Sequence, residues 1–264
     1  MSAENKFGKT SEVRLESEYR DGKVILGDVF FTAPFKVMQP FYPASGDMQV
    51  MVLSASAGIM EGDEQNFFLH IRENTRMEYL SQSYEKIHRM KEGKARRQTK
   101  IVVEKNAYLK YAPLPTIPFK DSAFENRLEV ELADDSSGFL YQEILSCGRA
   151  ACGEKFAYRF YENQVTVRKQ GRVAYRDHIR FSPELFEMDG MGMYEGYTHL
   201  GSLVFFNLEK SEEWIRNVRE LLEETPGMEG GVTRTAQGDV VVRVLGNGAE
   251  TLLKILEKIQ VMNS

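Results

Sequence analysis

The sequence predicts a mainly β fold: a long β-rich body, followed by a C-terminal segment in which two α-helices accompany further strands. Stretches of alternating apolar and polar residues recur at intervals of roughly ten to twenty residues, as expected of half-buried strands. Helical periodicity is confined to the last third of the chain. These observations leave three architectures open, namely a sandwich, a barrel and a flattened solenoid, because no fixed sequence repeat selects one of them.

The chain begins with a predicted β-hairpin. Residues 13–19 and 24–31 alternate, and Asp21 and Gly22 between them form a pair typical of tight hairpin turns. The segment 30–43 places prolines among aromatic residues, which favours an irregular apolar crossing. Further strands are predicted over 48–55, 65–72, 75–81, 99–103, 107–112, 128–132, 139–146, 156–167 and 171–181.

The last third of the chain predicts a different arrangement. After an apolar strand, Ser211 is a suitable N-cap for a helix that ends before Pro226. A hairpin follows, and Gly248 opens a final amphipathic helix. We interpret 200–264 as a small α/β end segment of the same core, so that 1–264 is a single domain.

Composition excludes some classes of partner. The 264 residues carry a net charge of −5 with a pI of about 5.6, whereas proteins that bind nucleic acid or anionic membranes normally present a dominant basic face. The locally basic stretch 86–100 is diluted by acids, and we expect a solvated loop or a protein-docking face there. Two cysteines and the lack of a signal-peptide or membrane-span run lead us to expect a cytoplasmic protein with no nucleic-acid or membrane partner.

Sequence signatures for several kinds of chemistry are missing. None of the four histidines lies in a nucleophile signature, so we assign no catalytic residue. Cys147 and Cys152 lack the spacing of a zinc knuckle, and we predict neither a permanent metal site nor a bound cofactor. No glycine-rich phosphate loop connects a strand to a helix, so we do not expect the chain itself to hydrolyse nucleotide.

The densest group of functional side chains lies at 81–89, where hydroxyl, carboxylate, amine, imidazole and guanidinium groups follow one another. Downstream, three prolines within 113–118 remove backbone donors and hold the chain in extended geometry. This stiff arm presents Leu114 and Ile117. Apolar side chains on a rigid arm suit packing or a partner contact better than catalysis.

Two carboxylates are candidates for a functional role. Asp63 ends a turn that contains two glycines, and Glu143 lies in an otherwise apolar strand. A carboxylate in an apolar strand is unfavourable unless it is paired, hydrated or facing a water-filled space. For Glu143, ion pairing with Arg149 or another cation is the simpler structural interpretation.

Several long segments, in the same order along nearly the whole chain, resemble the urease accessory protein family called UreD, or UreH in some bacteria. These segments are DVFFTAPFKVMQPFYP (28–43), GIMEGD (58–63), SQSYEKIH (81–88), APLPTIPF (112–119), EILSCGR (143–149) and MYEGYTH (193–199). The resemblance implies a β-rich, helical-solenoid-like body with two α-helices in its C-terminal α/β segment.

The resemblance also implies a non-enzymatic scaffold for nickel insertion into urease. The expected partners are apo-urease, a UreF-type helical accessory protein and, through that complex, a UreG-type GTPase that carries nickel. A homodimer within the complex is a further expectation. Nickel would pass through a water-filled tunnel in the body, so that the metal is in transit and is no cofactor of the chain.

Individual residues acquire roles from the same resemblance. The acid of the family's Gly-Asp turn matches Asp63, and an acid before its Gly-Arg pair matches Glu143, so both are expected to line the nickel passage. Ser83 and Glu85, from the polar group at 81–89, are further candidates for this passage.

The family pattern Thr-Lys-x-Tyr-Arg is matched at Lys86 and Arg89, while Glu85 replaces its threonine and His88 its aromatic residue. Together with the proline-rich arm, this gives five candidates for partner contact. They are Leu114, Ile117, Phe119, Lys86 and Arg89.

A hypothesis of another class is a β-solenoid hydrolase that acts on a carbohydrate or an ester. Asp63, Glu85 and Glu143 would then take acid and base roles. Such an enzyme requires a long cleft with paired acids at a fixed separation.

Overall fold

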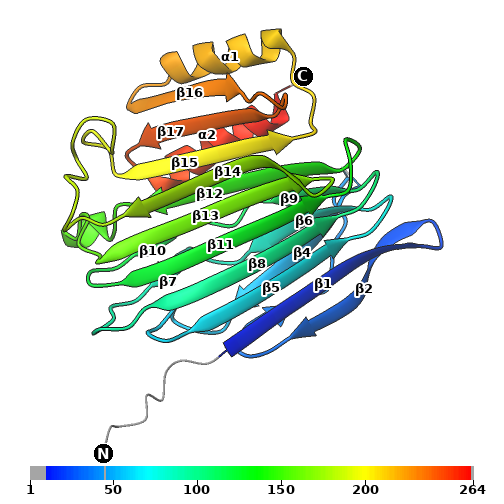
Figure 1. Ribbon diagram of the computed structural model, residues 1–264, viewed down its shortest axis with the longest axis horizontal. Helices are drawn as coiled ribbons and strands as arrows, with labels where there is room; N and C mark the ends of the chain where they lie inside the picture. Colours follow the sequence, from blue (N-terminus) through cyan, green and yellow to red (C-terminus); the bar gives the residue numbers. More distant parts are fainter. Residues whose placement is uncertain (1–9, 45, 263–264) are drawn as a thin grey trace, which may run out of the picture.

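The computed structural model describes residues 10–44 and 46–262. Within them, seventeen strands form two sheets with a buried apolar core between them, and two α-helices accompany the sheets (Figure 1). The prediction of a mainly β fold with two C-terminal helices is therefore confirmed. None of the helices in the described ranges is long and apolar enough to cross a membrane.

Each sheet mixes parallel and antiparallel strands. Sheet A contains, in spatial order, β14 (Arg172–Phe181), β13 (Phe160–Lys169), β11 (Ala123–Leu132), β8 (Ala95–Val103), β5 (Glu64–Ile71), β1 (Thr10–Arg20) and β2 (Lys23–Phe31). Sheet B contains β16 (Met228–Arg234), β17 (Val240–Gly246), β15 (His199–Phe206), β12 (Gly138–Ser146), β9 (Tyr108–Tyr111), β6 (Arg76–Ser81), β4 (Met48–Ser54) and β3 (Phe35–Val37).

From β4 to β13 the chain coils between the two sheets. It alternates between sheet B and sheet A, and each returning strand lies parallel to the preceding strand of its own sheet. This is a flattened solenoid, one of the three architectures that the strand pattern leaves open. On one side of the coil, β7 (Glu85–Ile87) and β10 (Thr116–Pro118) pair with each other, and β10 also pairs with β12. The only other helical turn in the described ranges is a short 3-10 segment, Ala150–Cys152.

Alternation along the strands places apolar side chains between the sheets. Val13 and Leu15 of β1, Leu69 of β5 and Ile101 of β8 are almost fully buried in this core. Burying one aliphatic side chain of this size contributes about 1.5–3 kcal/mol. The core between the sheets therefore accounts for much of the stability of the coil.

The two helices cover the outer face of sheet B near its C-terminal end (Figure 1). In α1 (Glu212–Glu223), Trp214 packs edge-to-face against Phe205 of β15 with 5.3 Å between ring centroids. In α2 (Ala249–Val261), the apolar face is buried on the same second core. Because β15 pairs with β12, the α/β end segment continues sheet B.

Two local predictions are confirmed by backbone geometry. Asp21 and Gly22 both have positive φ angles, 51° and 79°, as a tight turn between β1 and β2 requires. Ser211 caps α1, because its hydroxyl accepts a hydrogen bond from the backbone N–H of Trp214 at 3.0 Å. The predicted irregular crossing is only partly irregular, since it contains β3.

The prediction of a loop or docking face for 86–100 is wrong for much of that stretch. Residues from Ala95 onward belong to β8, which lies inside sheet A between β5 and β11. The charges mislead because they follow the strand alternation: Arg96 and Lys100 are exposed, whereas the side chain of Arg97 is only 11% exposed. A strand with this many charged residues has the amino-acid composition of a loop, although its backbone is part of a sheet.

The cap of α1 gives a first prediction. Ser211→Ala removes an acceptor from the first turn and should lower the free energy of unfolding by about 1 kcal/mol. Ser211→Asp keeps an acceptor there and should retain most of the stability. Urea denaturation followed by circular dichroism measures both, and equal stability of Ser211→Ala and the parent chain would contradict the capping role.

Candidate functional site

Two small cavities follow each other inside the coil. The outer cavity, of about 130 Å³, is lined by residues that include Ser56, Tyr79, Ser83, Glu85 and Arg97. The inner cavity, of about 30 Å³, has room for roughly two water molecules. Its lining includes Thr99, Asn126, Tyr141, Glu143 and Tyr161. Both cavities share Glu85, Arg97, Tyr111 and Pro113.

One rung of sheet A supplies two of the lining residues, Arg97 and Asn126. Gln65, Arg97, Asn126 and Asn163 are consecutive register partners on β5, β8, β11 and β13. The parallel coil brings these four residues into one row, although about thirty residues of chain separate each from the next along the sequence. The row, which we call the polar rung, lies beside the mainly apolar core between the sheets.

Arg97 is the cation of the polar rung, and it is held from several sides. Its Nη1 lies 2.5 Å from Oε2 of Glu85, and its Nε donates to Oε1 of Gln65 at 2.9 Å. The guanidinium also lies over the rings of Phe67 and Phe124. Burial disfavours the charge, but the Glu85 carboxylate more than offsets this effect and raises the pKa of Arg97, which stays protonated.

Glu143 is the carboxylate at the inner end. It accepts hydrogen bonds from the hydroxyl of Tyr161 at 2.6 Å and from the side-chain amide of Asn163 at 2.7 Å, with Tyr141 at 3.3 Å. The expected pairing with Arg149 is wrong, because Arg149 forms its ion pair with Glu154. Burial raises the pKa of Glu143, although these hydrogen bonds favour its charged form.

Neutral oxygen atoms make up the rest of the inner lining. Burial, followed by the nearby Glu143 carboxylate, raises the pKa of the Tyr161 and Tyr141 hydroxyls well above the usual value, so both stay neutral. The Oδ1 atom of Asn126 is buried and has no hydrogen-bond partner among the described residues, although its Nδ2 donates to Asn163 at 3.0 Å. A buried amide oxygen of this kind normally meets water or a cation, and Asn126 lines the inner cavity.

The predicted passage residues lie in different places. Glu85 lies at the junction of the two cavities, Glu143 lines the inner one, and the exposed Ser83 lines the outer one. Asp63 lies outside both linings, and its Oδ2 accepts a hydrogen bond from the backbone N–H of Met60 at 2.8 Å within its turn. Among residues 10–44 and 46–262, no three His, Cys, Asp or Glu side chains gather into a metal-binding cluster.

Four of the predicted contact residues lie near the ribbon of β7 and β10. Lys86 and Ile117 are register partners on its two strands, and Lys86 is exposed. Phe119 follows β10 and packs against the ring of His88 at 4.9 Å. The exposed Arg89 pairs with Asp121 at 3.0 Å.

Leu114 differs from these four residues. It lines the inner cavity, and its backbone N–H donates to the hydroxyl of Ser81 at 2.8 Å. A substitution at Leu114 therefore acts on the cavity as well as on any nearby surface.

Sequence reasoning misses three residues of this site. Arg97 is one of several cations in a basic stretch, so nothing in the sequence distinguishes it from its neighbours. Asn126 and Asn163 resemble the polar residues that occupy exposed strand positions. The available signal is strand parity, because Arg97 and Asn126 share the alternation phase of the buried Ile101 and Leu128 on their own strands.

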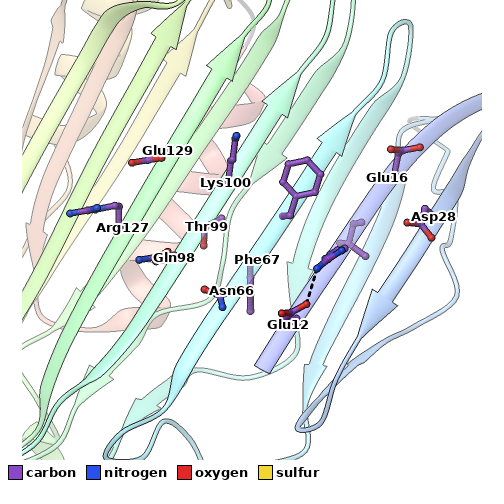
Figure 2. A pocket seen from close by; sticks show the side chains of 13 residues that line it. Glu12, Glu16, Asp28, Asn66, Phe67, Gln98, Thr99, Lys100, Arg127 and Glu129 are labelled. Carbon is purple, nitrogen blue, oxygen red and sulfur yellow. Dashed lines mark hydrogen bonds and ion pairs between the residues drawn. The ribbon is translucent and has the colours of Figure 1, made fainter. Parts of the chain in front are cut away.

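A larger groove, of about 590 Å³, crosses the outer face of sheet A. Figure 2 shows Lys100, Arg127 and Glu129 on its neighbouring strands, with Glu12 and Glu16 on β1. These charged side chains have both signs, and Glu12 forms an ion pair with Arg14 at 3.0 Å. Glu85 and Glu143 do not reach this groove, so the acids that a hydrolase would use lie elsewhere.

The raised pKa of Glu143 gives a prediction about stability. An acid whose pKa is raised by folding contributes stability at low pH, and this contribution is lost as the pH rises through the folded-state pKa. Glu143→Gln cannot ionise, so its free energy of unfolding should gain on that of the parent chain as the pH rises from about 4 to about 8. Urea denaturation across this range measures the difference, and a constant difference would contradict the raised pKa.

Comparisons with known proteins agree with one another. A family model described as UreD urease accessory protein matches residues 9–264. A urease accessory protein UreD from Acetivibrio thermocellus is 39% identical over 97% of this chain and 98% of its own length. The urease accessory protein UreH from Helicobacter pylori strain HPAG1 is 38% identical over 97% of this chain and 95% of its own length. The chain therefore belongs to the UreD family of urease accessory proteins.

Proposed function

We propose that this chain is a non-catalytic scaffold of the nickel-insertion complex, and that nickel passes through its interior along the outer and inner cavities. Membership of the UreD family assigns the chain to urease maturation. The hydrolase hypothesis has no support from these relatives, which are named as urease accessory proteins. The observation that carries the proposal is the sequence of two adjoining cavities with a carboxylate at their junction and another at the inner end.

The chemistry of the lining suits transit. A passage for a divalent ion needs ligands that attract the ion but are too few to trap it. Carboxylate and neutral oxygen ligands exchange nickel more readily than a cage of cysteine and histidine would. Glu85 and Glu143 are single carboxylates, and the groups around Glu143 are hydroxyls and amides.

For assembly, we propose that the chain joins apo-urease to a UreF-type helical protein, and through it to a UreG-type GTPase that brings nickel. The outer surface of the β7 and β10 ribbon, with Lys86, Ile117 and Phe119, is the proposed contact for one of these partners. Two observations support this contact. Lys86 is an exposed cation beside the half-buried apolar side chains of Ile117 and Phe119, and the ribbon that carries them pairs with β12. A second copy of the chain within the complex is a further proposed partner.

The passage predicts a loss of nickel loading. Glu143→Gln keeps the shape of the side chain but removes its charge, so nickel bound per urease active site should fall on the order of tenfold, the scale of losing one group in a metal environment. The measurement is nickel content and urease activity after co-expression of the urease subunits and the remaining accessory proteins. Omission of this chain sets the lower limit of the assay.

Asp63→Asn is the matched control for that experiment, because Asp63 lies outside both cavities. Co-purification should show that each variant still enters the complex, and the loading should fall with Glu143→Gln alone. Equal losses for the two variants would place the passage elsewhere, and normal loading with Glu143→Gln would remove Glu143 from it.

The proposed contact surface predicts a loss of partner binding that is separate from nickel loading. Ile117→Asp introduces a charge into the apolar part of the ribbon and should weaken association with the helical accessory protein or with apo-urease by at least about tenfold. Val173→Asp is the control, because Val173 is an exposed aliphatic residue on β14. Pull-down at graded concentrations compares them, and unchanged binding by Ile117→Asp would exclude this surface.

A further inference from the structure

The loop that joins β14 to β15, residues 182–198, exposes several large apolar side chains. Met191 is 96% exposed, the highest value among the large apolar residues in the described ranges, and Leu185 and Phe186 are 74% and 51% exposed. The loop, in yellow-green, projects beyond the ends of the strands on the left of Figure 1. Apolar side chains scattered singly over a surface are ordinary, but several in one short projecting loop indicate a contact with another molecule.

The 182–198 loop has a defined shape. Its Tyr194 is 1% exposed, and the ring packs edge-to-face against Phe156 at 4.8 Å and Phe181 at 5.7 Å between centroids. Met188 is also buried, and its carbonyl accepts a hydrogen bond from the backbone N–H of Tyr194 at 3.0 Å. Because these anchors already order the loop, a partner that binds it incurs a smaller entropy cost than one that must order a flexible segment.

The same loop is acidic. Its sequence contains four acids and no lysine or arginine, and all four acids are exposed. Asp189 forms an ion pair with Lys155 at 2.8 Å. Glu184 and Glu187, which flank the exposed apolar pair at 185–186, form no ion pair with another described residue. The apolar side chains therefore lie within a surface of uncompensated negative charge.

We infer that the 182–198 loop is a docking surface for a protein whose apolar pocket is rimmed by lysine or arginine, an inference that rests on the proposed scaffold role. The exposed apolar side chains fill the pocket, and the acids meet the cations on its rim. Nucleic acids and anionic membranes carry the same sign of charge as the loop, which repels them. A second copy of the chain, docked loop to loop, also brings like charges together.

The loop and the β7 and β10 ribbon differ in charge and adjoin different cavities. The ribbon presents the exposed cation Lys86, which lines the outer cavity. Tyr161 lines the inner cavity and is the register partner of Phe181, whose ring packs against Tyr194 of the loop. A partner on the loop therefore adjoins the inner end of the proposed passage, and a partner on the ribbon adjoins the outer end.

The experiment measures binding of the purified full chain to two immobilised probes, apo-urease and the UreF-type helical accessory protein. Apo-urease is also offered the chain together with the helical protein. Leu185→Gln combined with Met191→Gln removes the apolar contact and should weaken binding to at least one probe by about tenfold or more. Val261→Gln is the matched control, because Val261 on α2 is 74% exposed, as Leu185 is. It should leave both affinities unchanged.

A second variant, Glu184→Gln combined with Glu187→Gln, tests the charged rim. Charges at the rim of an interface act mainly on the association rate and on its dependence on salt. The association rate of this variant should be at least about threefold below that of the parent chain at about 0.01 M salt, and close to it at about 0.15 M salt, where charges are screened. Surface plasmon resonance measures the rates, and Glu257→Gln, an exposed acid on α2, is the control.

Unchanged binding of the Leu185 and Met191 variant to both probes, when the parent chain binds them, would overturn the docking surface and leave the scaffold role in place. An unaltered salt dependence in the Glu184 and Glu187 variant would overturn the basic rim of the partner. A parent chain that binds neither probe would overturn the scaffold role as well. A parent dimer that dissociates in the apolar variant, measured by sedimentation, would assign the loop to a second copy and overturn the inference. Circular dichroism confirms that each variant retains its sheet structure.

Discussion

The interior depends on one constraint, the polar rung formed by Gln65, Arg97, Asn126 and Asn163. In a parallel coil, each turn adds one strand to each sheet, and residues of equal parity fall into rungs that run across the strands. The neighbouring rung, which contains Phe67, is already largely apolar. A polar rung inside such a core is stable only if its members find hydrogen-bond partners. Arg97 donates to Gln65 and Asn126 donates to Asn163 within the rung, and Asn163 donates to Glu143 outside it.

The same rung divides the interior into two electrostatic regions. At its β8 position, a protonated guanidinium is balanced by Glu85, so the junction of the cavities is close to neutral. Beyond it, among residues 10–44 and 46–262, Glu143 has no ion-pair partner and relies on hydroxyl and amide donors. Burial raises its pKa because those donors replace only part of the hydration that a free carboxylate would have. An incoming cation would supply the missing counter-charge.

Stability and the proposed nickel passage thus make opposite demands on one set of residues. A fully paired interior would hold the two sheets firmly but would offer an ion nothing to bind. An unpaired Glu143 destabilises the folded chain at neutral pH, yet in the proposed nickel passage it is the group that would attract a cation to the inner cavity. The second core beneath α1 and α2 is built mainly from apolar side chains, with the ammonium group of the buried Lys210 over the rings of Phe205 and Trp214. It stabilises the end of the coil away from the two cavities.

Most of the local structure and the family could be predicted from the order of the residues. Alternation located the longer strands but missed the three-residue strands β3, β7 and β10. The Asp21 and Gly22 pair predicted a turn that adopts positive φ angles, and Ser211 marked the start of α1. Which charged side chains are buried depends on contacts between strands that are distant in sequence. Arg97 sits in a stretch with the composition of a loop, and Arg149, near Glu143 in sequence, pairs with Glu154 instead. In a coil, the side chains that meet are set by the register between strands about thirty residues apart in sequence. The spacing of residues along the chain does not reveal this register.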